Sequence, residues 1–439
     1  MIKYRLSRFT IANFYDNGYW LYNSLYSIKG YANEDKYISQ IEKLLDGELI
    51  SSDEVYEELK PFCVDDDVDE VKLALAMHNY KDAIDKALRL IIVTTNACNF
   101  RCRYCYEDHS VCLTMDDKFE RDLLNALSDY KSKYGLTNLI IEWYGGEPLI
   151  IYDKLIRYIA DINEWGKEND VICQHTATSN GYYLTKERYE ELCKLGFVRF
   201  QITVDGFKWT HNKLRCSSDN DGDTWSVIMQ NLKEIKDSDG NAIIILRANY
   251  SFELLSYLEE YVSFLCENFN NPKFQVFFYP IKRWGGENDS ELDALDESLL
   301  LPASEIILKT LSEHKLRSKF YIDRLNLFSQ ICYAGDQRSF FINTNGDIQK
   351  CSLVPDSTGK FNVIGTISGG KFDFNETYNF MFCTPDMNIM REKGCFDCAY
   401  LPVCYGLCCP YALVTKGEIR CIKEKMSMEA LLEYDYKTK

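Results

Sequence analysis

The residues best suited to chemistry are three closely spaced cysteines, Cys98, Cys102 and Cys105, which form a C-x3-C-x2-C pattern. The pattern directly follows an apolar run at 88–94 of the kind that forms a β-strand. Three thiolates on one short loop can hold three irons of a [4Fe–4S] cube and leave the fourth iron without a protein ligand. Such an iron can bind a small molecule and pass it an electron. A zinc site is the alternative, but structural zinc usually takes four N or S ligands, often in C-x2-C pairs.

A second group of thiols lies nearer the C-terminus. Cys332 precedes a predicted hairpin turn, and a G-x4-C pattern then ends at Cys351. A C-x2-C-x5-C-x3-C pattern and one last cysteine complete the group, at Cys395, Cys398, Cys404, Cys408 and Cys421. A zinc ribbon would need only four of these thiols. The other cysteines are scattered along the chain, and we expect most of them to be small buried side chains.

Three further motifs end predicted strands. They are Tyr-Gly-Gly-Glu-Pro at 144–148, Thr-Ser-Asn-Gly at 178–181, and a run at 201–206 that is followed by His211 and Arg215. Glycines allow close approach of the backbone, and a carboxylate can pair with an ammonium group. Each motif alone would be an ordinary turn or strand-end cap, but their positions after successive strands indicate one shared site.

The cysteine pattern and the Gly-Gly-Glu-Pro motif resemble the signatures of the radical S-adenosylmethionine (SAM) enzymes. The resemblance implies that the open iron chelates the amino and carboxylate groups of SAM, which is cleaved reductively to a 5′-deoxyadenosyl radical. It places a tyrosine near the adenine, and the glycine-rich motif at the SAM amino group. Polar strand-end residues would hold the ribose and the carboxylate. The expected SAM contacts are Tyr104, Gly145, Gly146, Glu147, Pro148, Ser179, Asn180, Thr203 and Arg215.

The C-terminal thiols resemble the SPASM extension of radical SAM maturases, which binds two auxiliary [4Fe–4S] clusters. The resemblance assigns Cys332, Cys351 and Cys408 to auxiliary cluster I. It assigns Cys395, Cys398, Cys404 and Cys421 to auxiliary cluster II, so that the chain would carry three [4Fe–4S] clusters. No cysteine lies between 333 and 350, where some relatives have one. Cluster I therefore either keeps an open iron or recruits Cys383 or Cys409.

Strand and helix patterns alternate from residue 88 to about 280. The strands are expected at 88–95, 138–143, 171–178, 198–204, 242–250 and 273–280, and the helices at 116–134, 152–168, 185–195, 224–237 and 254–268. Such alternation predicts βαβ units and a parallel sheet. We therefore predict an α/β fold with a partial (β/α)6 barrel, as the resemblance also implies. By analogy with full barrels, the chemistry belongs at the C-terminal ends of the strands.

Four parts are predicted along the chain: 1–85, the barrel at 86–282, a bridging region at 283–330 with a helix at 302–314, and the SPASM domain at 331–439. In the first part we expect strands at 4–11 and 18–23, a hairpin turn at 16–18, and helices at 37–45, from about 52, and at 68–78. That order resembles the winged-helix recognition element of peptide-modifying enzymes, which binds the leader of a precursor peptide as an added strand. A packing domain without a ligand is the alternative.

Composition limits the possible partners. The formal net charge of −17 argues against nucleic acid, which binds Lys and Arg. No window holds the ~18 apolar residues of a membrane span, and Met1–Arg5 does not begin a signal peptide. We therefore expect a cytoplasmic protein that binds no membrane and whose cysteines are thiols rather than disulfides.

The function that the resemblance implies is maturation of a ribosomally made precursor peptide. The chain resembles streptide cyclases and the thioether-forming ranthipeptide and sactipeptide synthases, which close a C–C or C–S cross-link. A one-electron reductant such as flavodoxin or ferredoxin would supply an electron to the first cluster. An auxiliary cluster could accept the excess electron that remains when the cross-link closes. The sequence identifies no catalytic base. A sulfatase-maturing enzyme that forms formylglycine and a non-enzymatic iron–sulfur carrier are the alternatives.

Overall fold

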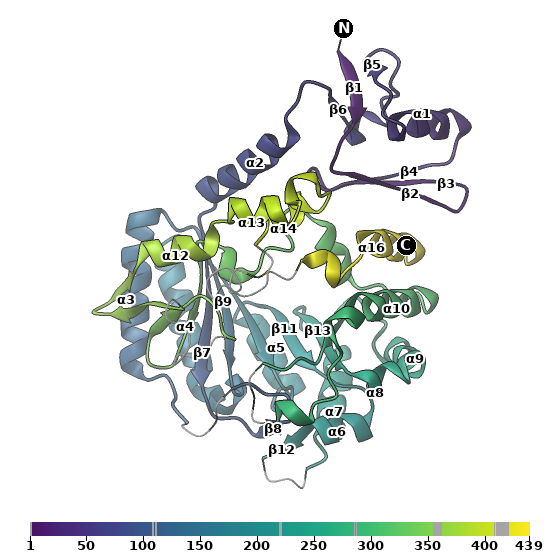
Figure 1. Ribbon diagram of the computed structural model, residues 1–439. Helices are drawn as coiled ribbons and strands as arrows, with labels where there is room; N and C mark the ends of the chain where they lie inside the picture. The colour runs from purple at the N-terminus through teal and green to yellow at the C-terminus, as the bar shows by residue number, and fades with distance from the viewer. Residues whose placement is uncertain are drawn as a thin grey trace.

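The computed structural model in Figure 1 describes residues 2–439 except 108, 110, 111, 219–221, 285, 287, 354–361, 408 and 410–420. The expected cluster ligand Cys408 therefore lies outside the described residues. None of the helices in the described part of the chain is both long and apolar enough to cross a membrane.

A parallel sheet forms the body of the molecule. Its six barrel strands run in the order β7-β9-β10-β11-β13-β14, and each neighbouring pair is parallel. They are β7 (Ala87–Thr95), β9 (Asn138–Gly145), β10 (Ile172–Ser179), β11 (Phe197–Thr203), β13 (Ile243–Tyr250) and β14 (Phe274–Pro280). The α/β class and all six predicted strands are confirmed, with ends that shift by a residue or two.

The connecting helices also match the predicted periodicity. They are α3 (Asp117–Tyr134), α4 (Tyr152–Glu168), α5 (Lys186–Lys194), α7 (Thr224–Lys236), and α8 and α9 (Phe252–Leu255 and Leu258–Phe269). Side-chain caps fix where they begin: the Asp116 carboxylate accepts from the Phe119 N–H, and Thr185 caps α5 in the same way. Because these helices cover the sheet, strand residues such as Ile92, Trp143 and Phe200 have no exposed surface.

The C-terminal part continues the same sheet. Strand β15 (Ser339–Ile342) pairs parallel with β7, and β16 (Asp347–Gln349), β17 (Val363–Ser368) and β18 (Lys371–Phe374) follow in antiparallel order. In the described residues the sheet thus has ten strands. The predicted boundary at 331 divides the chain by composition, but the hydrogen-bonded sheet crosses it.

Much of the rest of the chain forms short helices. The predicted bridging helix is α10 (Leu300–Glu313), and α6 (Lys208–Leu214) precedes Arg215. The C-terminal helices are α11 (Lys319–Ile322), α12 (Glu376–Cys383), α13 (Met387–Glu392), α14 (Leu401–Cys404) and α16 (Met428–Lys437). Figure 1 shows α13, α14 and α16 between the sheet and the N-terminal part of the chain.

The N-terminal residues build two small sheets. One has the order β5-β1-β6 and the other β2-β3-β4. The elements are β1 (Lys3–Leu6), β2 (Thr10–Tyr15), β3 (Gly18–Asn23), β4 (Ile28–Ala32), α1 (Asp35–Leu45), β5 (Ile50–Ser51), β6 (Cys63–Asp65) and α2 (Glu70–Ile84). The hairpin turn is confirmed, since Asp16 and Asn17 both have positive φ, at 52° and 63°.

Two predictions for this part are wrong. The strand expected at 4–11 is divided into β1 and β2, which belong to different sheets. The helix expected from about 52 is absent: 52–59 is mostly turns, and only a short 3-10 helix, Lys60–Phe62, follows. Pro61 has no N–H to donate to a preceding carbonyl, which disfavours continuous α-helix here.

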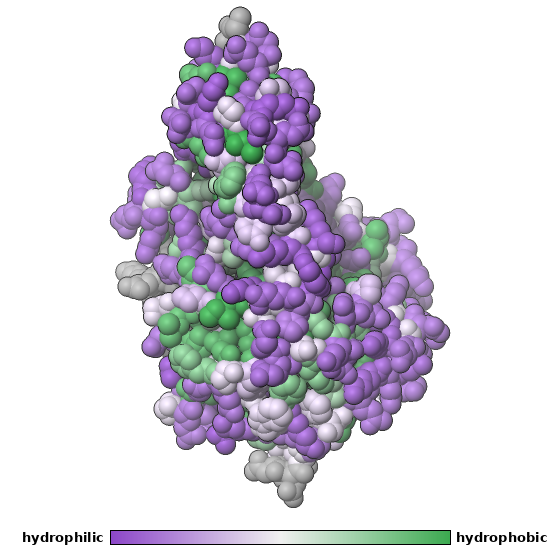
Figure 2. Space-filling view, turned by 90° about the vertical axis from the view of Figure 1, so that its right-hand side faces the viewer, coloured by the Kyte–Doolittle hydropathy of each residue, from purple (hydrophilic) through white to green (hydrophobic). Residues whose placement is uncertain are grey.

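The β2-β3-β4 sheet is packed against the C-terminal helices. Tyr22 donates a hydrogen bond to the Leu325 carbonyl, and Lys29 forms an ion pair with Asp435 at 3.0 Å. Phe9 and Leu25 share a small core with Leu401 and its neighbours. The rest of the N-terminal part projects as a narrow, mostly hydrophilic knob, while apolar residues gather lower on the broader body (Figure 2).

Candidate functional site

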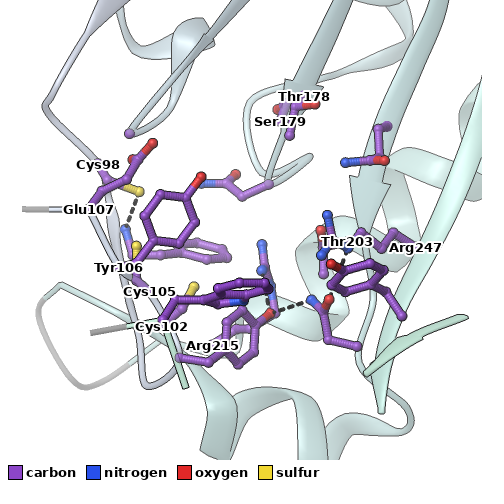
Figure 3. A pocket seen from close by; sticks show the side chains of 18 of the residues that line it. Cys98, Cys102, Cys105, Tyr106, Glu107, Thr178, Ser179, Thr203, Arg215 and Arg247 are labelled. Atoms are coloured by element: carbon purple, nitrogen blue, oxygen red, sulfur yellow. Dashed lines mark hydrogen bonds between the residues drawn. The ribbon is translucent and has the colours of Figure 1, made fainter. Parts of the chain in front are cut away.

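One cavity lies at the C-terminal ends of the barrel strands, with about 930 Å³ of empty space including its open mouth. Cys98, Cys102 and Cys105 line one side, and Thr203 and Arg247 line the other (Figure 3). The location agrees with the expectation for a parallel barrel.

The cysteine loop connects β7 to the short strand β8 (Phe100–Cys102), which pairs with β12 (Arg215–Ser217). In that pairing Cys102 lies opposite Arg215. The Cys98 sulfur accepts the Phe100 N–H at 3.3 Å, and a turn between Cys102 and Cys105 is closed by a 3.0 Å backbone bond. The loop thus brings its three sulfurs to one wall of the cavity.

Burial makes these thiols poor anions on their own. It raises the pKa of Cys98 and Cys105 to about 12 and also raises the pKa of Cys102, against the opposing effect of Arg215. A bound metal would supply the positive charge that converts them to thiolates. Arg215 is itself buried, and its Nε has no hydrogen-bond partner among the described residues. A cavity with three thiols and an unsatisfied guanidinium fits an anionic cluster or the carboxylate of a ligand.

The spacing of the sulfurs argues against one tetrahedral zinc. Four ligands at the Zn–S distance of ~2.3 Å would place sulfurs about 3.8 Å apart. Among the described residues, only Cys105, Glu107 and His109 form a set of three possible metal ligands whose donor atoms all lie within 4.8 Å of one another. The three cysteines are therefore more widely spaced than one zinc requires, as expected when each binds a different iron.

The two glycines at the end of β9, Gly145 and Gly146, pack against the cysteine loop. A Cβ on Gly145, where φ is 129°, would lie 2.3 Å from the Thr95 carbonyl oxygen. A Cβ on Gly146 would lie 2.4 Å from that of Ala97. The Gly146 and Glu147 N–H groups donate to the same two carbonyls at 2.9 Å. Both glycines line the cavity as predicted, and their lack of side chains also lets two loops meet.

Glu147 lies behind the cavity wall rather than in it. Its carboxylate accepts the Ser179 hydroxyl at 2.8 Å, the Asn180 N–H at 2.6 Å and the Leu149 N–H at 3.0 Å. Burial raises its pKa despite these bonds. Neither Glu147 nor Pro148, both predicted SAM contacts, is among the residues that line the cavity. Here Glu147 positions Ser179 and Asn180, which do line it.

Tyr104 is fixed by a buried polar network. Its hydroxyl contacts Asp205 and receives hydrogen bonds from Arg215 at 2.8 Å and Asn249 at 3.0 Å. Asp205 in turn accepts the Asn249 N–H at 2.7 Å. Tyr104, Arg215 and the predicted Thr203 all line the cavity. The sequence reasoning missed Asp205 and Asn249, although both stand just after or at the end of a predicted strand.

Apart from Thr203, the residues of the wall opposite the cysteines were also missed. This wall comes from the ends of β11, β13 and β14 and from the loop that follows, and includes Gln201, Arg247, Tyr279, Lys282 and Trp284. The Arg247 guanidinium lies 4.4 Å from the centre of the Tyr279 ring. Position at the carboxyl ends of the last strands was the available signal for these residues.

Tyr279 connects this wall to the C-terminal thiols, because Cys332 and Cys409 are near enough to act on its hydroxyl. Burial raises the pKa of Tyr279 most, the two cysteines raise it as well, and Arg247 and Arg324 oppose the increase. The Cys332 N–H donates to the Leu407 carbonyl at 3.0 Å. The pKa of Cys332 is raised to about 11, chiefly by burial and also by the neighbouring Cys351 and Cys409. Cys332, Cys351 and Cys409 therefore lie together beside the cavity.

Cys383 has different surroundings. It is buried with Phe382 and Ala334, in contact with the Cys332 segment, and its thiol interacts with Lys350. The second C-terminal group is separate: Cys395 lies near Cys398 and Cys421, with Lys423 beside all three. Cys404 is buried in the core that also contains Cys398.

Several known proteins are similar to this chain in sequence or in fold. Residues 92–254 match the model of the Radical SAM superfamily. The chain is 22% identical over 343 residues to a cysteine-type anaerobic sulfatase-maturating enzyme of Clostridium novyi, covering 74% of this chain and 88% of that one. SuiB of Streptococcus suis bound to precursor peptide SuiA has a similar fold over 99% of this chain and 100% of its own, with 14% identity and a TM-score of 0.51. The anSMEcpe protein with bound AdoMet and the Kp18Cys peptide covers 80% of this chain and 97% of its own, with 14% identity and a TM-score of 0.59.

Proposed function

We propose that this chain, which carries a radical SAM domain at residues 92–254, is an enzyme that cross-links a ribosomally made precursor peptide through a C–S or C–C bond. One observation carries the proposal. The cavity bounded by Cys98, Cys102 and Cys105 is bounded on its far side by Tyr279, beside Cys332 and Cys409. A substrate in this cavity would lie between two groups of thiols.

The first group would hold a [4Fe–4S] cluster through its three cysteines, with SAM beside it. When bound, the cluster and SAM supply hydrogen-atom abstraction from an unactivated carbon. The protein's residues place the reactants: Ser179, Asn180 and Thr203 offer polar groups, and the Arg215 guanidinium offers an unsatisfied donor to a carboxylate. Tyr104 cannot rotate away without breaking three polar contacts, so its ring is a rigid part of the cavity wall.

We assign Cys332 and Cys351, with Cys408 and Cys409, to auxiliary cluster I. Cys395, Cys398, Cys404 and Cys421 are assigned to auxiliary cluster II. The neighbouring positions of Cys332, Cys351 and Cys409, and of Cys395, Cys398 and Cys421, support these two groups. Cluster chemistry of this kind is tuned by ligation, hydrogen bonds and burial, all of which the protein provides.

The N-terminal part would bind the leader of the substrate. Its two small sheets offer edge strands β2, β4, β5 and β6, to which an extended peptide can add by backbone hydrogen bonds. Similarity of fold to SuiB covers this part of the chain, whereas similarity to anSMEcpe covers 80% of the chain. A flavodoxin or ferredoxin would deliver the electron.

A second candidate is oxidation of a cysteine or serine to formylglycine, favoured by the relationship to the sulfatase-maturating enzyme over 74% of the chain. A purely structural iron–sulfur protein is disfavoured, because the superfamily that residues 92–254 match consists of enzymes.

The test is anaerobic reaction of the full chain with SAM, a low-potential reductant and short peptides encoded beside its gene. We expect 5′-deoxyadenosine and a peptide that has lost two hydrogens and kept its sulfur. Formylglycine formed from cysteine would instead replace sulfur by oxygen, and formylglycine formed from serine, which also loses two hydrogens, would react with a hydrazine as an aldehyde. Absence of 5′-deoxyadenosine from iron-loaded protein would reject both candidates. Cys98→Ala should stop SAM cleavage, while the scattered-thiol control Cys266→Ala should not.

A further inference from the structure

Lys350 is a buried lysine whose amino group has no carboxylate partner among the described residues. It follows β16, directly precedes Cys351, and has no exposed surface. Its Nζ donates to the backbone carbonyls of Asp336 at 2.8 Å and Ser339 at 2.9 Å. Among the described residues no carboxylate oxygen lies within 4.0 Å of this nitrogen. The Asp336 carboxylate instead contacts Arg89 at 3.3 Å.

A cysteine sulfur also lies close to the Lys350 amino group. Cys383 interacts with Lys350 and lies in one small cluster with Cys332. Burial lowers the pKa of Lys350, while Cys383, Asp336 and Cys332 oppose that effect. Removing a lone charge from water costs several kcal/mol, so a buried ammonium needs a nearby anion. The Asp336 carboxylate is paired with Arg89, so the remaining groups in this place that can become anionic are sulfurs: that of Cys383 and the ligands of a bound cluster.

We propose that Lys350 is the counter-cation of an anionic iron–sulfur cluster held at Cys332 and Cys351, and that it raises the reduction potential of that cluster. The inference rests on the proposed function. Reduction adds one negative charge, and a fixed positive charge in a poorly polarisable interior favours the reduced form. The cluster beside the cavity would thereby become the better electron acceptor of the two in the C-terminal part.

Lys423 provides the comparison. It lies beside Cys395, Cys398 and Cys421, but its side chain is exposed. Water and salt screen such a charge strongly. Two lysines, one buried and one exposed, thus accompany the two C-terminal groups of thiols, and we expect the buried one to have the larger effect.

The experiment uses the full chain with Cys98, Cys102 and Cys105 replaced by Ala, so that only the C-terminal clusters contribute to the spectra. Redox titrations followed by EPR would compare Lys350→Met with Lys423→Met. We expect Lys350→Met to lower the reduction potential of one cluster by at least about 59 mV, which is a tenfold change in its reduction equilibrium. The potential of the other cluster should not change. Lys423→Met should have a smaller effect, on the other cluster.

An unchanged potential in Lys350→Met protein with full iron would overturn the proposal. If the Lys350→Met protein loses iron from one cluster, the Lys350→Arg protein is measured next. Wild-type iron content and reduction potential in Lys350→Arg would support the role of charge. Loss of iron in both variants would also overturn it, since shape rather than charge would then matter. Protein that holds no iron even before these changes would reject the proposed function itself, which keeps the two failures distinct.

Discussion

The Tyr333 hydroxyl accepts a hydrogen bond from the Ser352 N–H at 2.8 Å, which ties the residue after Cys332 to the residue after Cys351. Ser352 also interacts through its side chain with Tyr106, the residue after Cys105, and Tyr106 lies 2.7 Å from the Tyr144 hydroxyl. A chain of hydroxyl groups therefore joins the cysteine loop of the barrel to two C-terminal cysteines. The three loops are held in one arrangement by residues that contain no cluster ligand.

Removing the central hydroxyl should loosen that arrangement. Tyr333→Phe leaves the Ser352 N–H without its acceptor, a loss of about 0.5–1.5 kcal/mol in unfolding free energy for a half-buried hydrogen bond. We expect altered EPR spectra of one C-terminal cluster and a lower yield of cross-linked peptide per SAM cleaved. Tyr80→Phe, at a side chain that is largely exposed, is the control. Wild-type spectra and yield in Tyr333→Phe would show that the hydroxyl chain has no such role.

The iron content tests the number of clusters. Three [4Fe–4S] clusters correspond to about twelve irons per chain in anaerobically purified protein. Replacing Cys98, Cys102 and Cys105 together by Ala should remove about a third of the iron and all SAM cleavage. The matched triple variant of the scattered thiols Cys112, Cys193 and Cys266 should keep both. Protein that contains zinc in place of iron would contradict the whole assignment.

The fourth ligand of auxiliary cluster I can be tested by two single variants. Cys409 lies near Cys332, whereas Cys383 interacts with Lys350, so we expect Cys409→Ala to perturb this cluster more strongly than Cys383→Ala. Mössbauer and EPR spectra with and without peptide would show the difference. If neither change affects the cluster and peptide does, a substrate thiolate occupies the open iron, which favours a C–S cross-link. A larger effect of Cys383→Ala would reverse our assignment.

The barrel could be predicted from sequence because buried parallel strands and amphipathic helices have distinct periodicities. The cysteine loop and Gly145–Gly146 could be found because short motifs encode them. The far wall was harder to find: Arg247 and Tyr279 line the cavity because β13 and β14 end there, and a single arginine or tyrosine has no motif spacing beyond that strand-end position. The helix expected near Ser52 failed because its cap signal is local, while Pro61 and the packing of Phe62 decide the outcome.

Leader binding should leave a mark on one edge strand. Because Tyr22, Lys29 and Phe9 pack the N-terminal part against the C-terminal helices, deleting residues 1–85 would expose part of the core. Hydrogen exchange of the full chain with added leader peptide is therefore the better test. We expect slower exchange in one of the edge strands β2, β4, β5 or β6, because added strand hydrogen bonds protect amides. Protection confined to the cavity, with none in these strands, would contradict a recognition role.

The buried His175 makes stability depend on pH. Trp143 donates to its Nδ1 at 3.3 Å, so Nε2 carries the hydrogen that faces Asn163 at 3.0 Å, and burial lowers its pKa from 6.5 to about 4. The folded chain then binds fewer protons than the unfolded chain between these values, so stability is full above pH 6.5 and falls as pH decreases. The loss should reach about 2 kcal/mol at pH 5 and about 3 kcal/mol at pH 4. Denaturant unfolding of wild-type and His175→Gln protein isolates this contribution, since glutamine can both accept from Trp143 and donate to Asn163. Equal pH slopes in the two proteins between pH 6.5 and 5 would refute it.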